Sequence, residues 1–266
     1  MGQTLAALLH QHGVCEIQDL YSRRSVSAEQ AAAFVGAGRV VSALADMRAA
    51  DAWLISVPDG QITEVAAQLA AAQGRVMQGA VAWHNSGFLS AEALAPLHAV
   101  GAAIASVHPV LSFATPASAV AQFARTLCGL EGQPRALAVL RPWVVAMGGQ
   151  GFEIESSKKP LYHAAAVFCS NFTVVLQGLA QEAWCESGVP AELLAPLTQT
   201  LLQSSVSNVC RMGPAEALTG PAARGDTAVV QRQAEVVQAW HPKAGEVYHL
   251  LSDMAAKLKR SGRTQE

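Results

Sequence analysis

Charged residues and paired cysteines are scarce in this sequence of 266 residues. Only 14% of the residues are charged while 51% are hydrophobic, so the chain can bury a large core and is not intrinsically disordered. Its 18 basic residues do not outnumber its 20 acidic ones, and the net charge of −2 gives no basic excess for binding nucleic acid. The five cysteines form no CxxC or CxxH pair, which favours reduced thiols in a cytoplasmic protein over disulfides or zinc ligands.

The sequence also has no long hydrophobic run and no pattern of a leader segment. The longest apolar stretches are interrupted by Gln, His, Arg or Asp before they reach the length of about 18 residues that a membrane span needs. Met1 is followed by Gly-Gln-Thr, without the basic start of a signal peptide. We therefore expect a cytoplasmic protein with no membrane partner.

The first half of the chain alternates short apolar segments with Ala-rich helical segments. This order predicts right-handed βαβ units and a mostly parallel sheet that is covered by helices on both faces. The predicted strands are residues 15–21, 39–43, 51–57, 75–83, 102–107, 126–131 and 152–155. The predicted helices are residues 3–12, 27–34, 62–72, 90–99 and 134–147.

The second half has a helical pattern throughout. Helices are predicted at residues 160–186, 190–211, 227–239 and 243–260, whereas residues 213–226 contain too much Gly and Pro and are predicted to be a loop. The sequence therefore predicts an α/β domain over residues 1–155 and an all-α domain over residues 156–266.

A dinucleotide-binding sheet normally carries a G-x-G-x-x-G turn between its first strand and first helix. Gly36-Ala37-Gly38 matches part of it, but a helical segment precedes these glycines, so we interpret them as a helix C-cap and a turn into the next strand. The better candidate is the start of the chain. Gly2 and Gln3 are either the end of a fingerprint whose strand and first two glycines are missing, or an ordinary N-terminus.

Three predicted strands end in polar residues, at the edge where such sheets bind ligands. Ser22, Arg23 and Arg24 follow one strand, where an NAD enzyme usually has an acid. Two arginines and a hydroxyl suit the 2′-phosphate of NADP instead, and a solvated basic loop is the alternative. The next two strands end in Val57-Pro58-Asp59 and His84-Asn85-Ser86-Gly87. The candidate cofactor contacts among them are Val57, Pro58, Asp59, Ser86 and Gly87, although a lone Asp or His at such a position could equally be a turn residue or a helix cap.

Two motifs in the helical half resemble a known family. Lys159-Pro160-Leu161-Tyr162-His163-Ala164-Ala165-Ala166-Val167, with Ser170-Asn171, is similar to the K-x-L-Y-H-A-A-A-V…S-N helix of Rossmann-like proteins with a helical C-terminal domain of unknown function. Residues 217–226 (ALTGPAARGD) resemble that family's A-L-T-G-P-x-x-R-G-D loop, and the strand ends fit as well. The resemblance spans nearly the whole chain and extends to 6-phosphogluconate dehydrogenase, ketopantoate reductase and pyrroline-carboxylate reductase.

This resemblance implies NADP as cofactor, reduction of a small-molecule substrate, and a homodimer built through the helical domain. Members of the family begin with a strand and G-A-G-R-V-G. The resemblance therefore also implies that this chain starts one strand late, without the turn that supplies backbone donors to the pyrophosphate.

Lys159 and His163 are the candidate catalytic residues. They are four residues apart and so share a helix face. The resemblance implies a lysine at this position as the acid/base, and burial would bring its pKa towards neutrality. The alternative is a surface pair Lys158-Lys159 with Tyr162 and His163 packed into the domain junction. The candidate substrate contacts are His108, Asn171 and Arg224, and Asp226 is expected to cap the helix that starts at Thr227.

Two other functions remain open from the sequence. One is a non-catalytic NADP-binding sensor or scaffold that keeps the fold without the chemistry. The other is a metal-dependent hydrolase built on His84, His108 and His163, which is disfavoured because these histidines are not spaced as an HxH or HxxxH ligand pair. We therefore expect no metal.

The long helix predicted at residues 160–186 also predicts assembly. It is apolar over most of its circumference, and such a helix must be covered on nearly every side. We expect a homodimer through residues 160–260 with an interface above about 2,000 Å² in total. In such a dimer, Arg224 of one subunit would approach the substrate site of the other.

Overall fold

The computed structural model describes residues 1–265, which form two compact units. The first unit is Met1–Asn171 and the second starts at Phe172. This division lies inside a long helical segment, later than the boundary expected after residue 155. The difference arises because the start of that segment belongs to the first unit: Lys159 and Tyr162 form hydrogen bonds with residues of the sheet.

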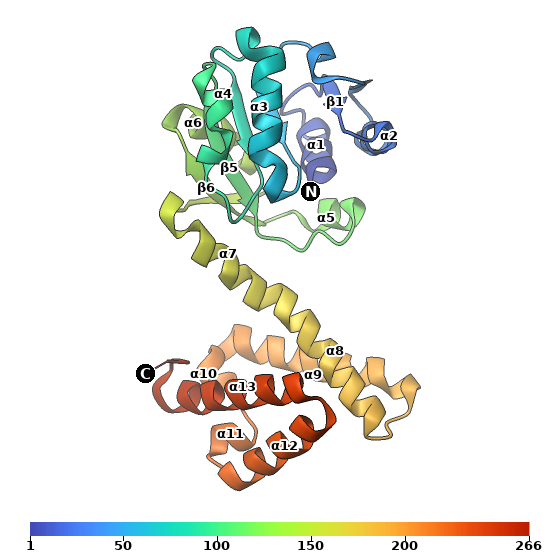
Figure 1. Cartoon of the computed structure of the whole chain (residues 1–266), viewed down its shortest axis with the longest axis vertical. Coiled ribbons are helices and arrows are strands. Elements are labelled where there is room, and N and C mark those ends of the chain that lie inside the picture. Colours follow the sequence, from blue (N-terminus) through green and yellow to red (C-terminus); the bar gives the residue numbers. More distant parts are fainter. Residues whose placement is uncertain (266) are drawn as a thin grey trace. The chain divides into compact units, whose positions relative to one another are not determined.

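The first unit alternates strands and helices, as predicted (Figure 1). Its strands are β1 (Asp19–Tyr21), β2 (Arg39–Val41), β3 (Ala52–Ile55), β4 (Val81–His84), β5 (Ala103–Pro109), β6 (Leu127–Gly132) and β7 (Gln150–Glu153). Its helices are α1 (Gly2–Gln11), α2 (Ser25–Val35), α3 (Ile62–Gln73), α4 (Ala95–Ala99), α5 (Pro116–Gln122), α6 (Pro134–Ala146) and α7 (Lys159–Val167).

The strands form two sheets. β1 pairs with β2 in parallel, and the five-stranded sheet has the order β3-β4-β5-β6-β7. All its neighbours are parallel except β5 and β6, which are antiparallel. The prediction of a mostly parallel sheet is therefore confirmed. Within residues 1–265 no ladder joins β1 to β3. The expectation that a strand is missing before Gly2 remains a prediction.

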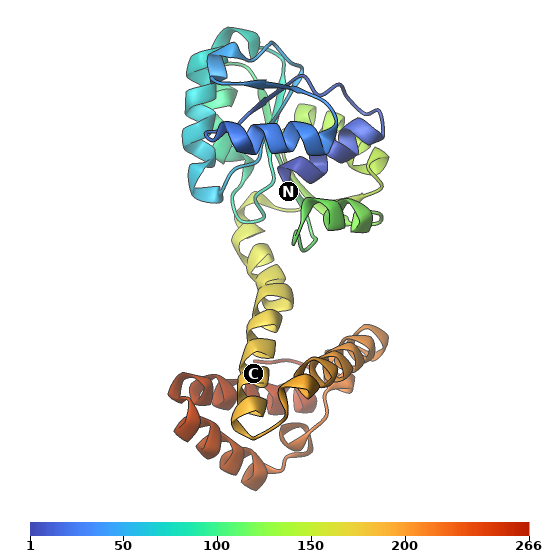
Figure 2. The same cartoon turned by 90° about the vertical axis from the view of Figure 1, so that its right-hand side faces the viewer.

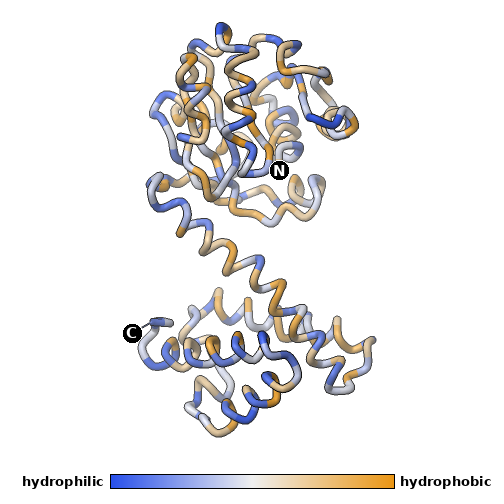
Figure 3. Tube along the Cα trace, viewed as in Figure 1, coloured by the Kyte–Doolittle hydropathy of each residue, from blue (hydrophilic) through white to orange (hydrophobic). Residues whose placement is uncertain are grey.

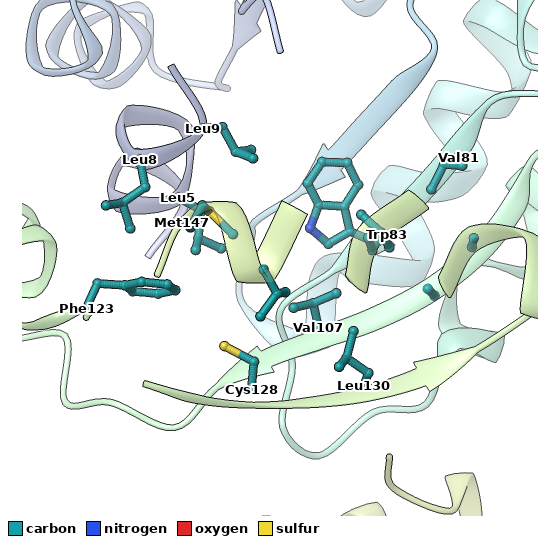
Figure 4. Close-up of a cluster of buried hydrophobic side chains, with 14 of the residues drawn as sticks. Leu5, Leu8, Leu9, Val81, Trp83, Val107, Phe123, Cys128, Leu130 and Met147 are labelled. Atoms are coloured by element: carbon teal, nitrogen blue, oxygen red, sulfur yellow. The ribbon is translucent and has the colours of Figure 1, made fainter. Parts of the chain in front are cut away.

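Helices cover both faces of the five-stranded sheet, which explains why its central strands lack polar alternation. One face packs against α1 and α6, with Leu5, Trp83 and Leu130 in a common cluster (Figure 4). The other face packs against α3 and the segment around α4, with Ile55 and Ile104 among the buried residues. Every residue of β4 and β5 is buried. The central strands therefore lie within the core over their whole length.

Several details differ from the sequence prediction. The strand expected at residues 75–83 is only Val81–His84, and its first part is a 3-10 turn at Gly74–Val76. The helix α5 was not predicted. Gly36 is the left-handed C-cap of α2, with φ of 76°, so the interpretation of Gly36-Ala37-Gly38 as a cap and turn is confirmed. Helix α2 lies beside α1 (Figure 2).

The second unit is helical. Its helices are α8 (Thr173–Glu186), α9 (Ala191–Met212), α10 (Pro214–Ala217), α11 (Pro221–Arg224), α12 (Thr227–Trp240) and α13 (Pro242–Ser261). The predicted loop at residues 213–226 is wrong in part, because it contains the one-turn helices α10 and α11, each started by a proline that pre-sets the helical φ. The side chain of Asp226 accepts a hydrogen bond from Val229 N, which confirms the predicted cap.

The long helix predicted at residues 160–186 forms with one irregularity. A π-helical turn, Phe168–Phe172, separates α7 from α8, and the chain passes from the first unit to the second within this turn. The whole segment Ser156–Glu186 has a mean hydropathy of 1.3 in its best window, none of which is buried. Figure 3 shows hydrophobic residues recurring along it. By length and composition alone this helix could cross a membrane, which corrects the expectation that no apolar run is long enough.

Candidate functional site

The candidate site lies in the first unit, where β3 and β4 end next to β5 and the start of α7. In a parallel sheet the carboxyl ends of neighbouring strands share one edge, so residues that follow different strands come together there. The structure brings together five predicted residues from four segments of the chain: Asp59, Ser86, His108, Lys159 and His163. Contacts within the first unit alone define this arrangement.

Lys159 is fully buried at the start of α7, with 0% of its surface exposed. Its Nζ donates hydrogen bonds to Ser106 Oγ, at 2.6 Å, and to Ser86 O, at 3.0 Å. The alternative of a surface Lys158-Lys159 pair is therefore wrong for Lys159, whereas Lys158 is exposed. Burial lowers the pKa of Lys159 from 10.5 to about 8, although the charges of Glu131 and Asp59 oppose the change.

The hydroxyl of Ser86 is already fully used within the protein. It donates to Asp59 Oδ2 at 2.7 Å and accepts the backbone N–H groups of Phe88 and Leu89, at 3.1 and 2.8 Å. Its carbonyl oxygen accepts from both Lys159 and Ser106. Ser86 thus connects the end of β4 to Asp59 and to α7, and its backbone N–H is also bonded within the protein, to His84 Nδ1.

His84 supports this loop and is not available as a metal ligand. Its Nε2 lies 2.9 Å from Ser90 O, and its Nδ1 accepts the backbone N–H of Ser86 at 3.1 Å. Both ring nitrogens are therefore occupied by the loop at residues 84–90. In the residues that the structure describes, no group of three or more His, Cys, Asp or Glu side chains could hold a metal ion.

Two histidine rings meet above Gly87. The rings of His108 and His163 are 5.5 Å apart between centroids, in an edge-to-face arrangement. A β-carbon built on Gly87 would lie 2.8 Å from His108 Nε2 and would collide with His163 Nδ1. Only glycine therefore fits between the end of β4 and these rings. His163 Nδ1 is buried and has no hydrogen-bond partner among residues 1–265.

Asn85 is a second polar group with spare bonding capacity. Its Nδ2 donates to Val107 O at 3.0 Å, which fixes the side chain against β5, but its buried Oδ1 has no partner within the described part of the chain. A buried acceptor without a donor carries a free-energy cost of about 1–3 kcal/mol, so this position suits a ligand donor or a water molecule.

The predicted cofactor residues at the chain start also have a defined geometry. Helix α1 begins at Gly2, and a β-carbon there would lie 2.8 Å from Ser56, directly after β3. Such a close approach of helix and strand is the role of the third glycine in a dinucleotide fingerprint. The first backbone N–H groups of α1, including that of Gln3, have no acceptor within the helix and can bind an anion.

The arginine pair lies at the end of β1. Arg23 and Arg24 are exposed and Ser22 is half-buried. Arg23 donates a 2.8 Å hydrogen bond to Gln61 Oε1, which places it beside the 3-10 turn Asp59–Gln61 that follows β3. Val57 and Pro58 lead into this turn. The basic residues and the β3 end therefore lie at one edge of the first unit, as a nucleotide site requires.

Two predicted substrate contacts are not part of this cluster. Asn171 is exposed in the π-helical turn at the end of the first unit. Arg224 is exposed in the second unit, at the end of α11. Their roles remain predictions.

Sequence reasoning missed four polar residues that complete the cluster: Asn85, Ser106, Glu131 and Tyr162. Asn85 lies inside the strand-end motif at residues 84–87, and Tyr162 lies inside the K-x-L-Y-H motif, where packing into the domain junction is the alternative. Ser106 and Glu131 were hidden inside predicted strands, where the only signal is a polar residue in an otherwise apolar segment. The Glu131 carboxylate accepts hydrogen bonds from Ala91 N at 2.8 Å and from Ser156 Oγ at 2.7 Å. It therefore links β6 to the segment after β4 and to the segment before α7.

Comparisons with known proteins agree with this architecture. Residues 1–109 match the family model of a Rossmann-like domain, and residues 126–255 match a domain of unknown function, DUF2520. Protein TM1727 from Thermotoga maritima is 28% identical, with a TM-score of 0.76 over 97% of this chain and 96% of that chain. No curated protein matches the sequence.

Two further solved structures share the fold at lower identity. BF3122 from Bacteroides fragilis, provisionally described as an NADP oxidoreductase, is 22% identical, with a TM-score of 0.77 over 96% of this chain and 93% of that chain. An imine reductase from Myxococcus stipitatus, in complex with NADP⁺, is 16% identical, with a TM-score of 0.67 over 99% of this chain and 92% of that chain.

Proposed function

The chain combines a Rossmann-like domain with a DUF2520 domain, and from this we propose that it is an NADP-dependent oxidoreductase that reduces a small carbonyl, imine or keto-acid substrate. The observation that carries the proposal is the buried amine of Lys159, with its lowered pKa, beside two histidines at the ligand-binding edge of the sheet. The NADP oxidoreductase and the imine reductases that share the fold support the same class of reaction.

The residues at the sheet edge fit a nicotinamide dinucleotide. Helix α1 starts at Gly2, close to Ser56, and the unbonded backbone N–H groups of its first turn would hold the pyrophosphate. Ser22, Arg23 and Arg24 would hold the 2′-phosphate of NADP by charge and by bidentate hydrogen bonds. When bound, the reduced cofactor supplies a hydride.

The protein must supply the matching proton, because a carbonyl or imine that accepts hydride becomes a strong base. A lysine with a pKa of about 8 holds its proton at neutral pH and can release and regain it readily. Ser86 O and Ser106 Oγ accept hydrogen bonds from Nζ and fix the position of the amine. Ser86 directly precedes Gly87, where the histidine rings meet. We assign proton donation to Lys159 and a substrate contact to His163.

The test is a screen for NADPH oxidation with cyclic imines, ketones and 2-keto acids. Turnover with one class, lost about 10²–10⁴-fold in Lys159→Met but retained in Lys158→Met, would support the assignment. Calorimetry should show that Lys159→Met still binds NADPH. Tight NADPH binding without turnover of any substrate would favour the alternative, a non-catalytic NADP-binding sensor or scaffold.

We also propose that the protein is a homodimer through residues 160–260. The apolar core clusters all belong to the first unit, and Ala244 is the one buried hydrophobic residue from position 172 to 265. Large side chains are exposed there instead, with Val174 at 71% and Val236 at 65%. A helical unit without a core cannot be stable by itself, so a second copy is the natural source of the missing contacts.

A further inference from the structure

His108 occupies the centre of an aromatic cluster at the end of β5. Its Nδ1 lies 2.8 Å from the hydroxyl oxygen of Tyr162, and the two rings are edge-to-face with centroids 5.5 Å apart. On its other side the His163 ring approaches it, also edge-to-face. The ring of His108 therefore has one nitrogen on Tyr162 and the other, Nε2, at Gly87.

Two glycines make this arrangement possible. Gly129 is the cross-strand partner of His108 on β6, and a β-carbon there would lie 2.9 Å from the Tyr162 hydroxyl and would collide with Ile154. Gly87 leaves the corresponding space beside Nε2. The backbone is thus shaped to admit the Tyr162–His108 pair on one side and to leave Nε2 accessible on the other.

The protonation states of the pair follow from burial. Burial raises the pKa of Tyr162 to about 12, so the phenol keeps its proton. Burial, together with the charges of His163 and Lys159, lowers the pKa of His108 to about 4, so the ring is neutral. A neutral imidazole carries one N–H, and a phenol is the better donor of the two partners.

We propose that Tyr162 is a positioning residue that donates its hydroxyl proton to His108 Nδ1 and thereby fixes His108 as the Nε2–H tautomer. His108 then presents a hydrogen-bond donor at Gly87. In the reaction, and this step rests on the proposed function, the donor polarises the carbonyl oxygen or imine nitrogen of the substrate. His108 thus polarises the substrate and stays neutral, while Lys159 supplies the proton.

The tautomer is measured directly by ¹⁵N NMR on protein labelled at histidine, with the His108 signals assigned by their loss in His108→Gln. In the wild type, Nδ1 should show the shift of an unprotonated nitrogen and Nε2 that of a protonated one. In Tyr162→Phe the two signals should move towards averaged values as both tautomers become populated. Tyr248→Phe, which removes a hydroxyl bonded to Gln233 in the second unit, should leave the His108 signals unchanged.

A wild-type His108 with the proton on Nδ1, or an unchanged tautomer in Tyr162→Phe, would overturn the proposal. This measurement needs neither substrate nor cofactor, so a failed reductase screen would count against the proposed function alone. With an active substrate, Tyr162→Phe should lower kcat by about two- to tenfold with little change in KM. Equal kcat in the two proteins would overturn the polarising role of His108.

Discussion

Replacement of Lys159 by Met should change how the stability of the protein depends on pH. Met has a similar length and no charge, and it removes a buried ammonium group while keeping most of the packing at the start of α7. The variant loses two hydrogen bonds, to Ser86 O and Ser106 Oγ. Ser106 still donates to Ser86 O, so one acceptor retains a partner.

The magnitude follows from the pKa of Lys159, which is about 8 in the folded protein against 10.5 in the unfolded chain. Below about pH 8 both states are protonated, and the folded state bears the cost of burying the charge. Above that pH the unfolded chain binds more protons, so the stability of the wild type rises with pH. One pKa unit corresponds to about 1.4 kcal/mol, which gives a gain of about 2.5 kcal/mol between about pH 7 and about pH 10.

The assay is urea unfolding followed by tryptophan fluorescence at both pH values, for the wild type and for Lys159→Met. The variant should be the more stable protein near pH 7, and this advantage should shrink by about 2.5 kcal/mol near pH 10. The exposed neighbour supplies the control, since Lys158→Met should shift both curves equally. A wild-type-to-variant difference that stays constant with pH would refute the assignment of Lys159 as the buried titrating group.

Three other changes test separate parts of the proposal. Replacing Arg23 and Arg24 together by Ala should weaken NADPH binding at least about tenfold in calorimetry and leave NADH binding unchanged, and equal losses would reject the 2′-phosphate site. Gly87→Ala should reduce turnover at least about tenfold, because its β-carbon would displace both histidine rings, and normal turnover would contradict the close approach. Val174→Glu should convert a dimer into monomers in sedimentation at micromolar concentration, whereas Val26→Glu, on an exposed residue of the first unit, should not; a wild-type monomer would refute the dimer.

The layers of the first unit and the mostly parallel direction of its strands could be predicted from sequence because they depend on periodicity and connection length. Apolar strands between helices of about ten residues leave few arrangements other than a mostly parallel sheet. The antiparallel direction of β6 relative to β5 could not be predicted in this way. The connection from β5 to β6 contains the short helix α5, whose signal, a Thr115 capping box followed by Pro116, is local and does not show the direction of the next strand.

The boundary of the helical half was harder to place for a different reason. Sequence patterns mark where strands end, at residue 155, but they do not show on which unit a continuous helix packs. The first turns of α7 carry Lys159 and Tyr162, whose hydrogen bonds to β5 residues tie them to the sheet. The end of the last predicted strand therefore places the boundary at residue 155, whereas packing places it after Asn171.

The candidate site shows the same limit at the level of single side chains. Topology gathers the residues that follow β3, β4 and β5, so Asp59, Ser86 and His108 could all be nominated from the sequence. Which of them remain available is decided by backbone groups that no motif reveals. The Ser86 hydroxyl is consumed by Asp59 and two N–H groups, whereas His108 keeps Nε2 at Gly87 because Tyr162 takes the other ring nitrogen. The hydroxyl of Ser86, which the strand-end motif nominates, is thus bonded within the protein, and the hydroxyl of Tyr162, which the sequence does not nominate, bonds a ring nitrogen of His108.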